Sequence, residues 1–500
     1  MQYLKISNIC FILFIFSMVA FAAIPTIKIT TQNGSDVTEK NYYVMNMELS
    51  DSDNPVHNLS KTGNVDSIKV RGNSTSDASK KPYRIKFDKK TSLFELPAAK
   101  SWVLLANYYD NTQILNALAF ELGKRFGLDF TPDYRFVDVY INNSYKGLYL
   151  LCDQIQVNEN RINISKKDGW LVEFDYHAPE ADEIRFQWKW NGLNGEDSLG
   201  TFVKSPDYDD PKSANIDWIK RDLDELSTKM FASDFPENGY RDLVDLDAMA
   251  KYIMIQKFLD NFDFNSQAQP GFLPGSNFHY KDVGGKITAG PLWDFDLSAG
   301  ITFSFSPEHF TTTGDDNHHN MIPTHSYYKR FFDDPVFLAK WKKLWDAHQT
   351  DINNLGVFID SIATYLEPSI MNNFNVLSSG ASSGGGGFGG FGGFGGFGAT
   401  YPSSYDSYKT DHVNKLKTWL TERQTFFNTK IDAMNIDISK DIMTFVPFNS
   451  KLELQNTSYD LPLYFSVKGH RLGHVKPVHS GIYYVKKGRT FEKITVLGLE

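Results

Sequence analysis

Acidic and amide residues in the middle of the chain have the chemistry that phosphoryl transfer requires. Asp260 and Asp263 follow one predicted helix, Asn277 opens a predicted hairpin, and Asp294 and Asp296 follow its second strand. In phosphoryl transfer one carboxylate orients the attacking hydroxyl. Further oxygen ligands hold a divalent metal against the phosphates, because charge spreads over the transferring oxygens. Carboxylate and amide oxygens suit magnesium or manganese.

The order of these residues is that of a kinase catalytic loop followed by a metal-binding aspartate. The spacing by itself is weak evidence, because Asp-x-Asp also occurs at residues 207–209, 222–224 and 245–247. The interval from Asp263 to Asn277 is also longer than the corresponding kinase interval. The alternative interpretation is a capped helix end followed by a surface turn.

The surrounding pattern predicts the elements that must position these residues. An amphipathic helix is expected over residues 247–259, and a hairpin over 277–281 and 286–293, turning at Gly284-Gly285. Residues 82–88 predict a strand in which Arg84 and Lys86 lie on the face opposite to the apolar side chains. A helix capped by Asp110 or Asn111 is expected through residues 115–126, and a second hairpin over 136–141 and 147–153.

Several ordered blocks resemble the spore-coat CotH kinase family. They read VRGNSTSDASKKPYRIKFDKK, KSWVLLANYYDNTQILNALAFELGKRFGL, TPDYRFVDVYINNSYKGLYLLCDQIQVNENRINI, PLWDFDLSAG and HVNKLKTWLTERQTFF, and with gaps they cover about residues 65–435. The resemblance implies an α+β, atypical protein-kinase-like fold with two lobes, as in atypical secretory kinases. It also implies use of ATP with magnesium or manganese, and favours a eukaryotic, fungal member.

The resemblance assigns roles residue by residue. Asp263 is similar to the catalytic aspartate, Asn277 and Asp294 to the metal-binding pair, and Asp296 to a second ligand. For the nucleotide, the resemblance implies a cation among Lys81, Arg84 and Lys86, a partner for it in Glu121, and a hinge for adenine that ends at Asp153 and Gln154. One departure is that Leu115 stands before Asn116, where family members often carry arginine, which leaves a kinase that binds without transferring as an alternative.

The composition predicts a folded, secreted protein. The 500 residues are 41% hydrophobic and 15% aromatic, which supports a sizeable core, and the net charge of −9 disfavours nucleic acid as a partner. Lys5, the apolar run at residues 9–22 and the Ala20-Phe21-Ala22 site predict a signal peptide over residues 1–22. Six Asn-x-Ser/Thr sequons favour a glycoprotein, and no later run is long enough for a membrane span. Cys152, the one cysteine after the predicted signal peptide, is expected to be an inert core thiol.

The chain is expected to divide into four parts. After the signal peptide come a β-rich segment at residues 24–65, a kinase-like domain at 66–440, and a β-rich unit at 444–500. Residues 380–398 repeat Gly-Gly-Phe and are expected to form a flexible insertion, while the His318-His319 pair is expected to lie in a surface loop rather than at a metal. The favoured function is an extracellular or cell-surface ATP-dependent protein kinase acting on coat, wall or surface proteins. The alternatives are a host-binding adhesin or invasin, and a pseudokinase scaffold.

Overall fold

The structure is a computed structural model that describes residues 23–180, 182–192, 195–265, 274–301, 310, 319–381, 401–441 and four short strands beyond residue 462. Two compact units are distinguished: the first contains residues 23–91 and 99–441, and the second contains residues 92–98 and the C-terminal strands. The predicted signal peptide lies outside the described residues, as does all but the beginning of the Gly/Phe tract.

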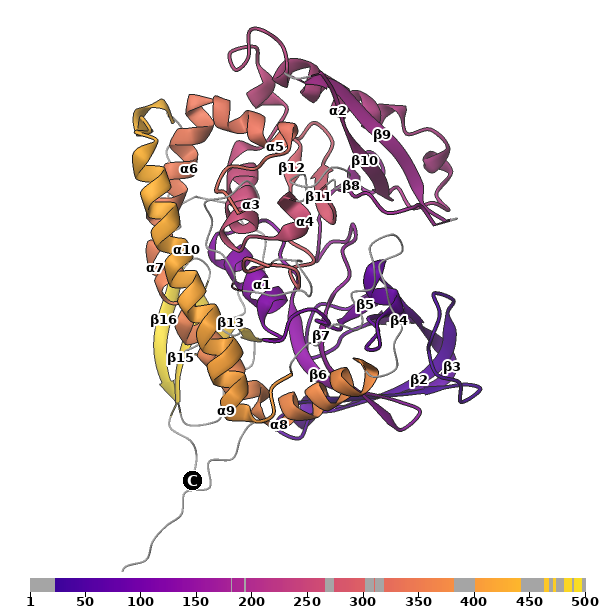
Figure 1. Cartoon of the computed structure of the whole chain (residues 1–500). Coiled ribbons are helices and arrows are strands. Elements are labelled where there is room, and N and C mark those ends of the chain that lie inside the picture. The colour runs from indigo at the N-terminus through magenta and orange to yellow at the C-terminus, as the bar shows by residue number, and fades with distance from the viewer. Residues whose placement is uncertain are drawn as a thin grey trace, which may run out of the picture. The chain divides into compact units, whose positions relative to one another are not determined.

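The first unit begins with a closed barrel of seven strands in the order β1-β2-β3-β4-β5-β7-β6 (Figure 1). Neighbouring strands are antiparallel, except that β1 closes the barrel by running parallel to β6. Its strands are β1 (Thr26–Thr31), β2 (Tyr43–Ser50), β3 (Leu59–Val70), β4 (Tyr83–Thr91), β5 (Ala99–Leu105), β6 (Tyr134–Ile141) and β7 (Ser144–Asp153). In β4, Tyr83, Ile85 and Phe87 are buried and Lys86 is exposed, which confirms the predicted alternation.

Helix α1 (Leu115–Arg125) follows β5 and has the predicted extent. The helix begins after Ile114 rather than at Asp110 or Asn111, but Asp110 accepts a hydrogen bond from the backbone N–H of Leu115 (2.8 Å). Gly127, with φ of +68°, ends the helix in the left-handed conformation. The β6–β7 turn consists of Asn142 and Asn143, both with positive φ, as a tight hairpin requires. These local signals in the sequence therefore set the local structure.

A second antiparallel sheet has the order β12-β11-β8-β10-β9. Its strands are β8 (Trp170–Phe174), β9 (Ile184–Gly192), β10 (Gly195–Ser205), β11 (Asn277–Lys281) and β12 (Thr288–Ala289). The predicted hairpin is present as β11 and β12, although β12 is shorter than expected. Strands β8 to β10 were not predicted. Helix α2 (Asp217–Met230) packs against β9.

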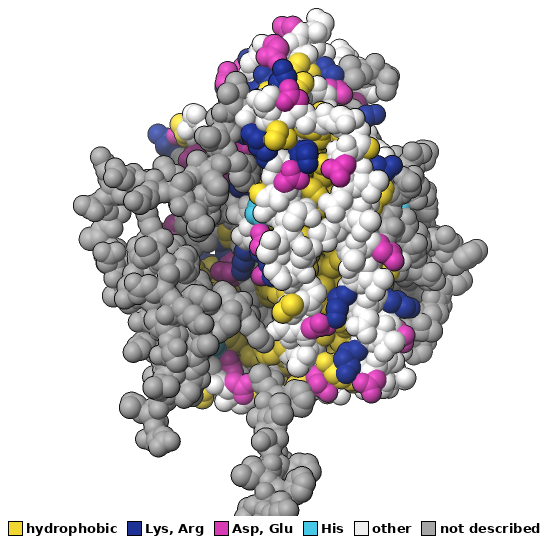
Figure 2. Space-filling model, turned by 90° about the vertical axis from the view of Figure 1, so that its left-hand side faces the viewer, with side chains coloured by type: hydrophobic (Ala, Val, Ile, Leu, Met, Phe, Trp, Pro, Cys, Tyr) yellow, Lys and Arg dark blue, Asp and Glu magenta, His cyan; other side chains and the backbone are white. Residues whose placement is uncertain are grey.

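Helix α3 (Leu246–Phe258) lies at the centre of the first unit and leads into α4 (Phe262–Asn265). The prediction that this helix is amphipathic is wrong, because side chains on every side of it, including Gln256 and Lys257, are buried. The remaining helices are α5 (Ser326–Arg330), α6 (Pro335–Ala347), α7 (Gln349–Asn353), α8 (Leu355–Ala381), α9 (Tyr405–Tyr408) and α10 (Asn414–Ala433). Figure 2 views the side where α6 and α10 lie, and the described part of this face carries charges of both signs interspersed.

Short helical turns occur at Pro55–His57, Ser74–Asp77, Pro211–Ala214, Tyr240–Asp242, Phe331–Asp333, Lys409–Val413 and Ile438–Lys440. The second unit contains an antiparallel sheet in the order β14-β13-β15-β16. Its strands are β13 (Leu463–Ser466), β14 (Arg471–Gly473), β15 (Gly481–Lys487) and β16 (Thr490–Val496). The α+β class is confirmed. No helix in the described parts of the chain is long and apolar enough to cross a bilayer.

Candidate active site

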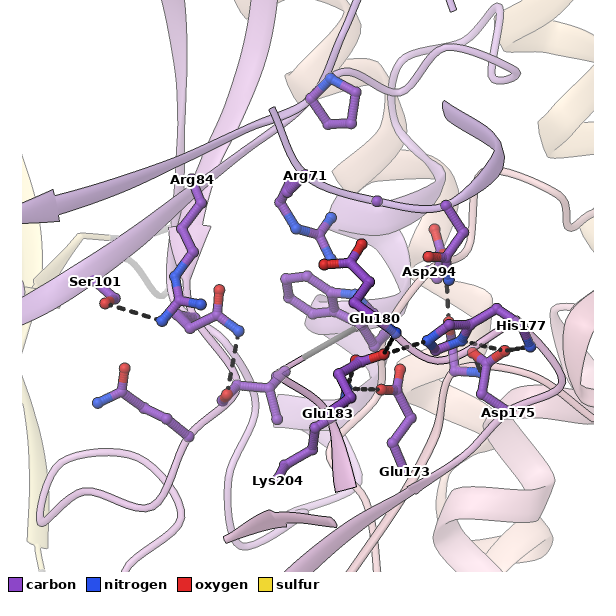
Figure 3. Close-up of a pocket in the computed structure, with 18 of the residues that line it drawn as sticks. Arg71, Arg84, Ser101, Glu173, Asp175, His177, Glu180, Glu183, Lys204 and Asp294 are labelled. Atoms are coloured by element: carbon purple, nitrogen blue, oxygen red, sulfur yellow. Dashed lines mark hydrogen bonds and ion pairs between the residues drawn. The ribbon is translucent and has the colours of Figure 1, made fainter. Parts of the chain in front are cut away.

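A cavity of about 1020 Å³ opens between the barrel and the second sheet. Strands β3 and β4 and the turn at Gly72 line one side of it, and β8, β10 and the segment after β8 line the other (Figure 3). The loops at Asp263 and at residues 293–297 complete the lining. Each wall therefore comes from a different part of the chain.

Three of the predicted acidic residues, Asp263, Asp294 and Asp296, line this one cavity. Hydrogen bonds tie their two loops together. Asn261 donates to the backbone oxygen of Asp294 (3.2 Å) and accepts from the N–H of Asp263 (3.2 Å). The N–H of Phe262 donates to the backbone oxygen of Leu297 (2.9 Å). The two loops thus form one connected support for the carboxylates.

The carboxylates repel one another in a largely enclosed space. Burial raises the pKa of Asp263 well above its usual range, and the charges of Asp294 and Asp175 raise it further. Burial and the neighbouring Asp294 and Asp263 raise the pKa of Asp296 in the same way. The pKa of Asp294 is also raised by burial, although Arg71 opposes this shift. Such a cluster gains stability when a cation shares the site.

A buried arginine on α10 holds the loop that carries Asp263. The Arg423 guanidinium is fully buried and donates to the backbone oxygens of Lys257 and His319 (2.5 Å each). It also lies 3.6 Å from a carboxylate oxygen of Asp260, which is hydrogen-bonded to the His319 ring. The expectation that His319 lies in a surface loop is therefore wrong, while His318 lies outside the described residues.

A chain of charged groups lines the wall formed by the second sheet. His177 contacts carboxylate oxygens of Asp175 (3.0 Å) and Glu183 (3.1 Å), and Lys204 pairs with Glu173 (2.8 Å) and Glu183 (3.0 Å). Burial by itself would lower the pKa of His177, but hydrogen bonds to the two carboxylates raise it to about 9. Figure 3 shows these residues side by side. The network fixes Asp175, which accepts from the N–H of Ser276 (2.9 Å).

The opposite wall is cationic, as the sequence predicted for Arg84 and Lys86. Both line the cavity, and Arg84 donates weakly to the Ser101 hydroxyl (3.4 Å). The Nζ atoms of Lys69 and Lys86 lie 5.2 and 5.5 Å from the centre of the Tyr42 ring. Burial lowers the pKa of Lys69, and the charge of Arg84 lowers it further. This wall therefore favours an anion.

Four of the predicted site residues do not line the cavity, whereas Gln154 does. The Lys81 ammonium donates to the backbone oxygen of Ser76 (2.5 Å). Glu121 pairs with Arg125 one helical turn later (2.8 Å), instead of with a cation on β4. Asp153 accepts from Arg161 (2.9 Å) and from the N–H of Asp133 (3.0 Å).

Asn277 is the fourth of these residues, and its amide is used inside the protein. Its oxygen accepts from the Tyr252 hydroxyl (2.8 Å) and its nitrogen donates to the backbone oxygen of Gly275 (2.8 Å). The side chain is completely buried and does not line the cavity. In this position the Asn277 side chain stabilises the start of β11 and does not face a metal site.

Sequence reasoning missed several residues that line the cavity. Asn116 accepts a hydrogen bond from the N–H of Phe295 (2.9 Å) and so joins α1 to the Asp294 loop. Asp175 and His177 were missed because strands β8 to β10 were not predicted. Arg71 stands in the quoted Arg-Gly-Asn turn, and this turn was the available signal for it.

The donor chemistry at Asp294 and Asp296 fits a divalent cation, because two carboxylates with raised pKa values line the same cavity. As the side chains stand, the described residues contain no group of three or more His, Cys, Asp or Glu that could hold a metal ion. The family model described as CotH kinase protein matches residues 68–427, which is most of the chain. The matched range includes every cavity residue discussed above except Tyr42. A search of curated proteins finds no match.

Proposed function

The chain belongs to the CotH kinase protein family, and from this premise we propose that it is a secreted protein kinase that transfers phosphate from ATP to protein hydroxyl groups. The observation that carries the proposal is the meeting of Asp263, Asp294 and Asp296 in one cavity, opposite a cationic wall. Within the proposal, the barrel and the helix-rich part of the first unit act as two lobes around the nucleotide. The leader predicted at residues 1–22 supports the secretory location.

Each cavity residue has a proposed role that follows from its position. Asp263 lies on the short helix after α3 and orients the acceptor hydroxyl. Asp294 and Asp296 would hold magnesium or manganese, which when bound neutralises charge on the phosphate oxygens. Arg84 and Lys86 attract the nucleotide from the other wall, and Gln154 lies where the resemblance expects adenine.

The test separates nucleotide binding from transfer. Asp294→Ala removes a charged ligand, so both binding of the nucleotide with manganese and phosphate transfer are expected to fail. Asp263→Ala leaves those ligands in place, so nucleotide is expected to bind while transfer falls by about 100-fold or more. If Asp296 is a second ligand, Asp296→Ala behaves like Asp294→Ala, with partial rescue at high manganese.

The measurements are calorimetry with ATP and manganese, and radiolabel transfer to a protein acceptor. Asp224→Ala is the matched control, because Asp224 lies exposed on α2 and outside the cavity lining. Full transfer by Asp263→Ala would show that the assignment of this aspartate is mistaken.

One observation favours a second candidate, a pseudokinase that binds nucleotide without transfer. The Asn277 amide is committed to Tyr252 and Gly275, so the metal-binding pair expected from the resemblance is not assembled in the structure. In this case wild-type protein binds nucleotide in calorimetry and gives no radiolabel transfer. The predicted adhesin role remains a further alternative, which binding to host cells by the Asp294→Ala protein would support.

A further inference from the structure

Arg71 directly follows the last residue of β3, and a backbone hydrogen bond holds it there. Its N–H donates to the backbone oxygen of Pro82 (3.1 Å), which fixes the start of the turn. Gly72 follows with φ of +87°, and a Cβ at this position would lie only 2.7 Å from the Thr75 hydroxyl. No other residue fits that conformation without strain. The turn therefore directs Arg71 into the cavity, where Figure 3 shows it between Arg84 and Asp294.

The guanidinium of Arg71 lies over an aromatic ring at the floor of the cavity. Its central carbon is 5.3 Å from the centre of the Trp293 ring, and Trp293 directly precedes Asp294 in the chain. Trp293 is itself buried, so the arginine rests on a firm platform. This contact orients the plane of the guanidinium but uses none of its N–H groups.

Those N–H groups have no partner among the described residues. No acceptor there lies within hydrogen-bonding distance of the Arg71 side chain, and no carboxylate oxygen lies within the 4.0 Å of an ion pair. Two other cavity cations are already paired, Lys204 with Glu173 and Glu183, and Lys40 with Glu180. Arg71 is thus a half-exposed cation whose donors face the open cavity beside Asp294.

A half-exposed guanidinium that lines a cavity without a partner is available to an anion, and phosphate is the anion that its planar fork matches best. We infer that Arg71 binds the phosphate chain of the nucleotide directly, beside the site at Asp294. This inference rests on the proposed function and assigns to that site a residue outside the set expected on β4. Two parallel N–H bonds to phosphate oxygens bring charge to where it accumulates during transfer.

The test compares ligands with and without phosphate. Arg71→Gln is expected to weaken ADP binding about tenfold or more in calorimetry, while adenosine binding stays unchanged. Arg71→Lys is expected to recover only part of the ADP affinity, because an ammonium does not form the paired bonds. Arg221→Gln is the control, because Arg221 is exposed on α2 and outside the cavity lining. Circular dichroism establishes that each variant is folded.

Each outcome separates this inference from the proposed function. If wild-type protein binds ADP and Arg71→Gln binds it equally well, the inference is overturned and the proposed function stands. If Arg71→Gln loses ADP and adenosine to the same degree, the arginine merely supports the cavity, and the inference is again overturned. If wild-type protein binds neither ligand, the proposed function fails and takes the inference with it.

Discussion

At the scale of single residues, the cavity contains ionisable groups whose pKa values in the folded protein differ from their ordinary values. Asp263 is the clearest example, because burial and two neighbouring carboxylates raise its pKa. A carboxyl group whose pKa is higher in the folded state lowers stability as the pH rises from its unfolded pKa, about 4, to its folded pKa. The residue proposed for catalysis therefore works against folding near neutral pH.

We predict that Asp263→Asn stabilises the protein at neutral pH while it abolishes transfer. The amide has a similar shape and removes the repulsion from Asp294 and Asp175. Urea unfolding at several pH values measures the effect, and the gain is expected to grow with pH above about 4. Asp168→Asn is the surface control, because Asp168 is exposed and lies outside the cavity lining. A loss of stability at neutral pH would contradict the assigned repulsion.

The effect of His177 on stability is opposite to that of Asp263. Asp175 and Glu183 raise the pKa of its imidazole from 6.5 to about 9, which favours the charged form. A raised histidine pKa contributes stability that is complete below pH 6.5 and is lost as the pH rises through about 9. We predict that His177→Gln is less stable than wild type at pH 6, and that the difference shrinks between pH 6.5 and 9. Urea unfolding across this window measures it. A difference that stays constant with pH would show that packing on Phe202, not charge, is what His177 supplies.

At the scale of elements, α10 supports the site from a distance. Arg423 joins it to the end of α3 and to the chain at His319, and its removal would leave Asp260 with His319 as its remaining described ion-pair partner. We predict that Arg423→Met lowers the free energy of unfolding by about 3–5 kcal/mol, because a buried carboxylate loses one of its partners and two buried backbone oxygens lose their donor. Transfer is expected to fall as well, since the Asp263 loop follows directly.

Urea unfolding of Arg423→Met beside Lys417→Ala measures this effect. Lys417 lies on the same helix and pairs with Asp360 at the surface (2.7 Å), so its loss is expected to cost about 1 kcal/mol or less. Equal losses for the two variants would show that Arg423 is not a special anchor.

The elements also show how far sequence patterns reach. Local signals were sufficient for α1 and for the β6–β7 hairpin, because Asp110, Gly127 and the Asn142-Asn143 turn act on their own neighbours. The burial of α3 depends on elements that pack around it from distant parts of the chain. The expected solvent-facing side is missing over residues 252–258, where even Gln256 and Lys257 are buried.

At the scale of the whole molecule, the candidate site also depends both on signals along the chain and on contacts between distant segments. Residue type and chain order, together with the family resemblance, predicted the acidic site, and the structure places Asp263, Asp294 and Asp296 in one cavity. They were not enough for Asn277, because its partner Tyr252 comes from another element. Arg71 was missed although the Arg-Gly-Asn turn marks its position, because its lack of a partner among the described residues depends on the folded surroundings. A pattern along the chain does not contain that information.

The parallel pairing of β1 with β6 constrains the order in which the chain is able to fold during synthesis. Thr26–Ile29 pair with residues 138–141, so more than one hundred residues must leave the ribosome before the barrel closes. Until then β1 has only β2 beside it, and its other edge is open to pairing with another chain. Contacts so distant in sequence form slowly. Strand β7, which joins β6 to β5, must also emerge, so nascent chains that expose residues up to 153 should resist protease far better than chains that expose only residues before β6.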